Sequence, residues 1–243
     1  MSHLRPILIT GANGGIGSGL VTYLKARGYE NIVCQYHRED NKLRELFGAE
    51  FNRHCFRADL TKESELDGLH QHVLDFFGQI YAVINLAGAS TSAMSWKLPV
   101  EEFQQVMNAN LLTTFLTCRK FIPELRSQGV GRIINTSSIV AHKGVAGAAH
   151  YCAAKAAITG FTKAIALELA NKNITANVLA LGYFNCGLIE ELAEVTQEVI
   201  KNATPVKRLG RVEDIGGLVE YLLSDEGSFM TGQVHHLNGG LYL

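Results

Sequence analysis

A short apolar run passes directly into a glycine-rich turn in the stretch Ile7-Leu8-Ile9-Thr10-Gly11-Ala12-Asn13-Gly14-Gly15-Ile16-Gly17. The apolar run is typical of a buried strand, and the residues from Gly15 to Arg27 have helical spacing. Glycine lets backbone N–H groups approach a phosphate closely, and the N-terminus of the following helix favours an anion. The stretch therefore predicts a phosphate-binding turn, with a glycine-rich turn that binds nothing as the alternative.

The rest of the chain alternates short apolar runs with longer helical patterns. We expect strands at 31–35, 51–56, 83–85, 132–136, 175–180 and 234–237, and helices at 42–47, 65–77, 99–126, 151–170 and 212–223. This alternation predicts an α/β fold, a doubly wound parallel sheet of about seven strands with helices on both faces. Residues 1–243 should form a single domain, with the irregular stretch 182–205 as a substrate lid.

Composition and charge argue against several classes of protein. The 243 residues carry a formal net charge of −1, without a basic stripe for nucleic acid, and the apolar runs are too short to span a membrane. The N-terminus does not resemble a signal peptide. The five cysteines form no CxxC pair and no metal-spaced cluster. We therefore expect a cytoplasmic protein with reduced thiols and no metal site.

The second strand ends in a segment that bears on cofactor choice, Val33-Cys34-Gln35-Tyr36-His37-Arg38. In dinucleotide-binding folds an acid at this place binds the adenosine ribose, whereas a basic residue accommodates a 2′-phosphate. Tyr36 stands where the acid is expected, and Arg38 follows, which favours NADPH over NADH unless Arg38 is only a solvated loop residue. Asp59, after the third strand, is a candidate for binding adenine or for forming a turn.

Tyr151 and Lys155 lie four residues apart in an expected helix and therefore share one of its faces. A nearby ammonium lowers the pKa of a phenol, which can then exchange a proton with an alcohol or ketone. Ser138 lies at the carboxyl end of an expected strand, where parallel sheets bind ligands, and its hydroxyl could bind a carbonyl oxygen. Ser137 is the neighbouring alternative, and either serine could simply form a turn.

Asn110 lies inside the expected helix at 99–126, where asparagine is mildly unfavourable. A functional role would be to hold a water molecule that bonds Lys155 and relays protons. Considered alone, Asn110 is better explained as a capping or surface residue.

These motifs, together with Asn85-Leu86-Ala87-Gly88, resemble the short-chain dehydrogenase/reductase family over essentially the whole chain. The resemblance implies a Rossmann-type domain, hydride transfer to or from a nicotinamide, and a catalytic tetrad of Asn110, Ser138, Tyr151 and Lys155. It also implies a set of cofactor contacts: Gly11, Asn13, Gly14, Gly15, Ile16, Gly17, Arg38, Asp59, Leu60, Asn85, Ala87, Gly88, Tyr151, Lys155 and Gly182.

Within this family the chain is most similar to the 3-oxoacyl-[acyl-carrier-protein] reductases, in residues 131–134, 151–164 and 230–240. That similarity implies an NADPH-dependent homotetramer acting on a small-molecule or carrier-linked acyl substrate. The chain departs from the family pattern in four places, with Gly14 for an arginine, Leu86 for an asparagine, Leu181 for a proline and Cys186 for a threonine. Without the loop arginine, Arg38, with His37, is left to hold the 2′-phosphate.

The sequence thus favours NADPH-dependent reduction of a 3-oxoacyl thioester or a similar ketone. The missing loop arginine keeps open an NAD-dependent dehydrogenase of a secondary alcohol. The altered positions Leu181 and Cys186 keep open a catalytically silent dinucleotide-binding sensor or partner subunit.

Overall fold

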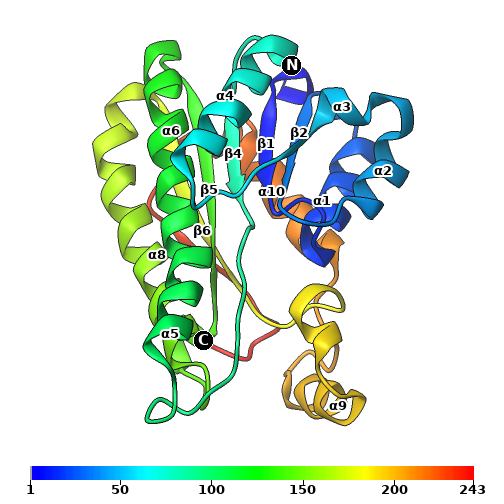
Figure 1. The fold of residues 1–243 in the computed structure, drawn as a ribbon, viewed down its shortest axis with the longest axis vertical. Coiled ribbons are helices and arrows are strands. Elements are labelled where there is room, and N and C mark those ends of the chain that lie inside the picture. Colours follow the sequence, from blue (N-terminus) through cyan, green and yellow to red (C-terminus); the bar gives the residue numbers. More distant parts are fainter. Residues whose placement is uncertain (1) are drawn as a thin grey trace.

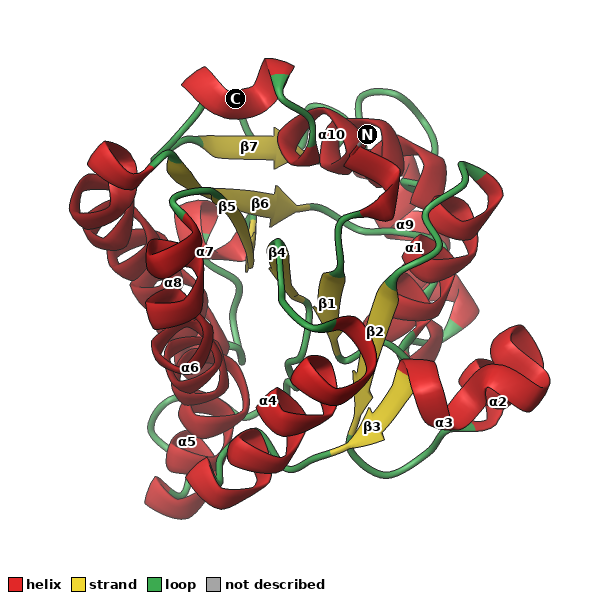
Figure 2. Ribbon diagram, turned by 90° about the horizontal axis from the view of Figure 1, so that it is seen from above, coloured by secondary structure: helices red, strands yellow, loops and turns green. Residues whose placement is uncertain are grey.

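The computed structural model describes residues 2–243 and contains one sheet of seven parallel strands (Figure 2). The strand order is β3-β2-β1-β4-β5-β6-β7. The strands are β1 (Ile7–Thr10), β2 (Ile32–Tyr36), β3 (Cys55–Arg57), β4 (Ala82–Asn85), β5 (Gly131–Ser138), β6 (Ile174–Leu181) and β7 (Val234–Leu237). The expected doubly wound α/β fold is confirmed.

Helices cover both faces of the sheet (Figure 1). On one side lie α1 (Gly15–Ala26), α2 (Asn41–Phe47), α3 (Phe51–His54) and α10 (Val212–Leu223), and on the other α4 (Glu63–Phe77), α5 (Val100–Met107), α6 (Thr113–Gln128) and α8 (Ala149–Leu169). The alternation of side chains along β1 explains the two layers, because Ile7 and Ile9 pack in one core cluster and Leu8 in the other.

The remaining elements are short. They are α7 (Val140–Lys143), α9 (Glu194–Ala203), the single turns η1 (Ser2–Leu4), η2 (Gly48–Glu50), η4 (Ala170–Lys172), η5 (Gly187–Glu191) and η6 (Glu226–Phe229), and the π-helical turn η3 (Asn108–Leu112). Among the described residues, no helix is long and apolar enough to cross a membrane.

Two sequence expectations are wrong in detail. The strand expected at 51–56 begins only at Cys55, because Phe51–His54 forms α3, with Phe51 buried in the core and His54 Nδ1 2.7 Å from the Ile32 carbonyl oxygen. The segment lacks the β-branched residues that favour strands. The helix expected at 99–126 is interrupted, since η3 separates α5 from α6.

A buried polar network fixes the ends of the central strands. The strand order reverses between β1 and β4, and ligands in such sheets bind outside the carboxyl ends of the strands at this point. Thr10 Oγ1 accepts the N–H groups of Leu86 and Ala87 at 3.1 and 3.2 Å, and Asn85 donates to Asn135 Oδ1 at 2.8 Å. These bonds hold the segment after β4 against the glycine-rich turn.

Candidate active site

The glycine-rich turn is built so that backbone, not side chains, faces the crevice. Gly11 has a φ of +64°, and a Cβ atom there would lie 2.8 Å from the Ala87 Cα. A Cβ on Gly17 would lie 2.3 Å from the Gly11 carbonyl oxygen, so helix α1 begins directly against the turn. The first N–H groups of α1 have no acceptor within the helix. This arrangement fits the pyrophosphate of a dinucleotide.

Gln35 braces this turn, and the sequence interpretation missed it. The side chain is buried, its Oε1 accepts the Gly11 N–H at 2.9 Å, and its Nε2 donates to the Ala58 carbonyl oxygen at 2.6 Å. Gln35 therefore joins the end of β2 to the glycine-rich turn and to the residue after β3. The available signal was a polar residue within an otherwise apolar strand.

The segment expected to form a lid lies on the glycine-rich turn. A Cβ on Gly15 would be 2.3 Å from the Gly187 backbone nitrogen, so the start of η5 contacts this turn directly. The Gly187 N–H donates to Glu190 Oε2 at 2.8 Å. Further along, α9 projects from the body of the molecule (Figure 1), and no residue from 194 to 203 is buried. The stretch 182–205 thus combines a contact with the turn and a weakly packed helix.

Tyr151 and Lys155 share a face of α8, as expected. The Lys155 side chain is only 4% exposed, and its Nζ donates to the Thr136 carbonyl oxygen at 3.0 Å and lies 5.5 Å from the centre of the Tyr151 ring. Burial lowers the pKa of Lys155 to about 8 and raises the pKa of Tyr151 to about 12. We expected Lys155 to lower the phenol pKa, and in this structure the loss of hydration outweighs that effect.

The structure separates the two candidate serines. Ser137 is buried, and its hydroxyl donates to the Lys155 carbonyl oxygen at 2.8 Å, which makes it a packing residue between β5 and α8. Ser138 ends β5 and is half-buried, with only long contacts of 3.4 Å to the Leu181 carbonyl oxygen and the Val140 N–H. Ser138 is therefore the serine whose hydroxyl can turn to a ligand.

Asn110 lies in the π-helical turn η3 and is fully buried, so the capping and surface alternatives are wrong. Its Nδ2 donates to the carbonyl oxygens of Ala89 and Val106 at 2.7 and 2.8 Å, while its Oδ1 is buried without a partner among the described residues. A Cβ on Gly88 would lie 2.5 Å from this Oδ1 and 3.4 Å from Lys155 Nζ. The orphaned oxygen and the ammonium therefore flank the same small space, as a bridging water would require.

A second phenol and a thiol lie beside Tyr151, and sequence reasoning did not assign them to the site. Burial raises the pKa of Tyr183, and the nearby Cys152 adds to this effect. Burial is also the main cause of the raised pKa of Tyr151, to which Cys152 and Tyr183 contribute. Cys152 is half-buried next to both phenols. The position of Tyr183 directly after Gly182 was the available signal.

The adenosine end of the crevice is more exposed. Arg38 follows β2 and is exposed to solvent. Asp59 Oδ1 accepts the Thr61 N–H at 3.0 Å and the Thr61 hydroxyl at 2.6 Å, so Asp59 does form a turn. Asn13 donates to Asn41 Oδ1 at 3.1 Å, which ties the glycine-rich turn to the start of α2.

Fold and site together define a dinucleotide-binding oxidoreductase, and comparisons with known proteins name its family. A family model described as Enoyl-(Acyl carrier protein) reductase matches residues 11–242. The chain is 34% identical to an acetoacetyl-CoA reductase of Acinetobacter sp. (strain RA3849) and 31% identical to the 3-oxoacyl-[acyl-carrier-protein] reductase FabG of Staphylococcus aureus (strain Mu50 / ATCC 700699), covering 100% of each chain in both cases. It is 33% identical to Nodulation protein G of Rhizobium sp. (strain N33), over 98% of this chain and 96% of that one.

This chain belongs to the short-chain dehydrogenase/reductase family. It is accordingly an NAD(P)-dependent oxidoreductase that acts on CH–OH or C=O groups.

Proposed function

We propose that the protein is an NADPH-dependent reductase of a 3-oxoacyl thioester or a similar ketone. The observation that carries this proposal is that Lys155 Nζ lies near the Tyr151 ring and beside the space that the orphaned Asn110 Oδ1 also flanks, with Ser138 at the carboxyl end of β5. The names of two relatives, acetoacetyl-CoA reductase and 3-oxoacyl-[acyl-carrier-protein] reductase, support an acyl thioester as substrate.

The protonation states of Tyr151 and Lys155 suit reduction of a ketone. A bound nicotinamide supplies the hydride. The Ser138 hydroxyl holds the carbonyl oxygen, and Tyr151 gives that oxygen a proton, because a phenol with a pKa of about 12 is fully protonated near neutral pH. Lys155, whose pKa is about 8, carries an ammonium proton at pH 7 and returns it to the phenol through a water at Asn110 Oδ1.

The cofactor contacts are assigned along the crevice. Backbone groups from Gly11 to Gly17 hold the pyrophosphate, Asp59 and Leu60 the adenine, and Arg38 the 2′-phosphate. The nicotinamide end of the cofactor is bound by a second set of residues: Asn85, Ala87, Gly88, Tyr151, Lys155 and Gly182.

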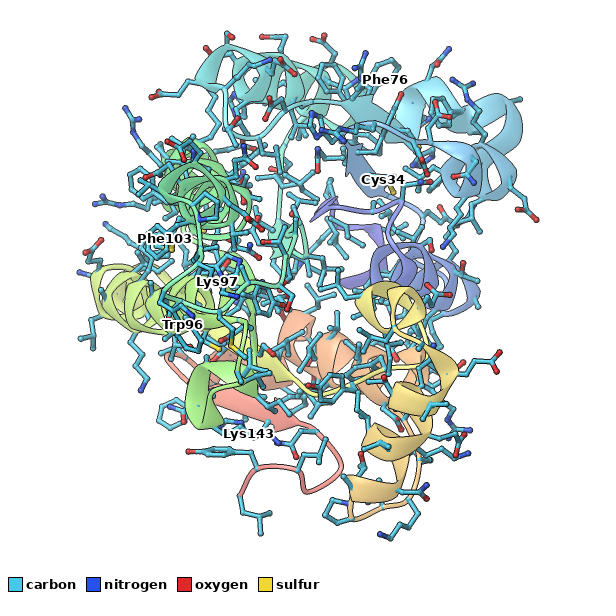
Figure 3. The ribbon with its side chains drawn as sticks, turned by 60° about the horizontal axis from the view of Figure 1, so that its bottom comes forward. Cys34, Phe76, Trp96, Lys97, Phe103 and Lys143 are labelled. Atoms are coloured by element: carbon cyan, nitrogen blue, oxygen red, sulfur yellow. The ribbon has the colours of Figure 1, made fainter. Side chains whose placement is uncertain are left out.

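Assembly into a cytoplasmic homotetramer completes the proposal. Large apolar side chains are exposed on α5 and α8, and Figure 3 shows Phe103 of α5 on the same side of the molecule as Trp96. Val100 is 76% exposed on α5 and Leu167 is 85% exposed on α8. Exposed apolar side chains of this size on two helices support contacts between copies of the chain.

The test is NADPH oxidation by the purified protein with acetoacetyl-CoA, run beside Tyr151→Phe. We expect turnover in the wild type and a fall of about 10²–10⁴-fold in the variant, with NADPH binding retained. A variant that kept most of its turnover would overturn the assignment of Tyr151. Turnover only with NAD and a secondary alcohol would favour the dehydrogenase alternative, and binding without any turnover would favour the sensor.

A further inference from the structure

Most acidic side chains at the adenosine corner are already neutralised by other groups. The exception is Glu39, which is exposed directly after Arg38 and takes part in no ion pair among the described residues. Asp40 pairs with Arg44 at 2.8 Å, and Lys62 lies 3.4 Å from Asp59 and 3.0 Å from Glu65. Within residues 2–243, neither Arg38 nor Arg57 takes part in an ion pair, and both are exposed. The carboxyl ends of β2 and β3 therefore present two arginines that have no ion-pair partner among the described residues.

The structure brings Arg57 to the segment that carries Arg38. Arg57 is the register partner of Tyr36 across β2 and β3, and its Nε donates to the His37 carbonyl oxygen at 3.0 Å. This bond uses one donor of the planar guanidinium and leaves both terminal nitrogens without a protein partner among the described residues. Arg38 is the next residue after His37, so the two arginines belong to the same corner of the crevice.

Tyr36 occupies the position where an acid would bind the ribose hydroxyls, yet its side chain turns away. Its ring lies 5.9 Å from that of Phe51 on α3, and burial together with the nearby Asp40 raises the pKa of its hydroxyl. No carboxylate therefore projects from position 36 toward an incoming phosphate, and the charge of the nearby Asp40 is committed to Arg44.

We propose that Arg57 is a specificity-determining residue that binds the 2′-phosphate of NADPH together with Arg38. This inference rests on the NADPH preference in the proposed function. The two guanidinium groups, at the ends of adjacent strands, supply charge-assisted hydrogen bonds to the dianionic 2′-phosphate. They take the place of the loop arginine, because Gly14 stands at that position in this chain. A ribose hydroxyl in the same place would gain little from them.

Calorimetric binding of 2′,5′-ADP and 5′-AMP tests this without substrate or turnover. Arg57→Met should weaken 2′,5′-ADP binding by about 10-fold or more, since bonds to charged groups are the stronger ones, and should leave 5′-AMP binding within about twofold. Arg57→Lys, which keeps the charge but not the fork, should lie between. The matched control is Arg53→Met on α3, whose guanidinium lies 5.5 Å from the centre of the Phe77 ring, and it should change neither affinity.

Each other outcome has a defined meaning. Unchanged 2′,5′-ADP binding in Arg57→Met overturns the proposal, and equal losses for both nucleotides show that Arg57 only supports the His37 segment. If Arg57→Met fails to fold, Arg57→Lys decides, because an affinity equal to the wild type contradicts a bidentate role. A wild type that binds both nucleotides equally removes the NADPH preference as well. If the wild type discriminates between the two nucleotides but does not reduce acetoacetyl-CoA, only the proposed substrate is contradicted.

Discussion

The two ends of the crevice differ in how far water reaches their functional groups. At the carboxyl ends of β4 and β5, Asn110 is 0% and Lys155 4% exposed, and the pKa values of Lys155 and Tyr151 depart strongly from their usual range. At the ends of β2 and β3, Arg38 and Arg57 are exposed. Charges interact far more strongly where water is excluded. Substitutions at the buried end should therefore strongly change turnover and stability, whereas substitutions at the exposed end should change nucleotide affinity by smaller amounts.

The largest effect is expected for Lys155→Met. Turnover should fall by about 10³-fold, because the variant loses the ammonium that, in the proposed mechanism, supplies protons to Tyr151. At the same time the protein should become more stable at pH 7. A pKa lowered from 10.5 to about 8 means a burial penalty on the order of 3 kcal/mol, and loss of the bond to the Thr136 carbonyl oxygen reduces the gain to about 2 kcal/mol.

Urea unfolding of the wild type and Lys155→Met at pH 7 and about pH 10 checks the sign of this stability difference. Below about pH 8 the folded wild type carries the buried ammonium and its full penalty. Between about pH 8 and 10.5 the folded chain has released a proton that the unfolded chain still holds, so the free energy of unfolding of the wild type rises with pH. The advantage of Lys155→Met should therefore vanish by about pH 10. A constant advantage at both pH values would contradict the assigned cause.

Asn110→Leu should have the next largest effect. Turnover should fall by about 10–100-fold through loss of the bridging water, and stability by about 1–3 kcal/mol because the Ala89 and Val106 carbonyl oxygens lose their donor. Asn108→Leu is the matched control on the same π-helical turn, where the Asn108 side chain only accepts a bond from Gln104 at 2.7 Å. Equal losses of turnover in both variants would show that the turn matters and the orphaned oxygen does not.

Local patterns were enough to predict the strands other than β3, the glycine-rich turn and the shared face of Tyr151 and Lys155, because each depends on residues close in sequence. The roles of Gln35 and Arg57 depend on which strands lie side by side, which no local pattern contains. The burial of Asn110 depends on a π-helical turn with no clear sequence signal. The pKa of Tyr151 was predicted in the wrong direction, since burial follows from the whole packing.

At the exposed end, Arg38→Ala should weaken 2′,5′-ADP binding by about 10-fold and leave 5′-AMP binding within about twofold. Because these guanidinium groups face water, the discrimination should also shrink as salt is raised from about 0.05 to 0.5 M. Calorimetry at both salt concentrations measures this. If salt left the discrimination unchanged, the phosphate would be bound in a more enclosed place than the exposed arginines provide.

The smallest effect is expected at the segment that joins the two ends. Cys186 precedes η5, whose Gly187 lies on the glycine-rich turn, and burial raises the pKa of its thiol, so it stays a weak neutral donor. Its extended backbone, with φ −153° and ψ 161°, suits a β-branched residue. Cys186→Thr should therefore lower the KM for NADPH by about threefold, because a hydroxyl forms a stronger hydrogen bond to the cofactor than a thiol does. The kcat should change by no more than about twofold. Cys186→Val has the shape of threonine without its hydroxyl, so an equal fall in KM for that variant would assign the gain to lid packing instead.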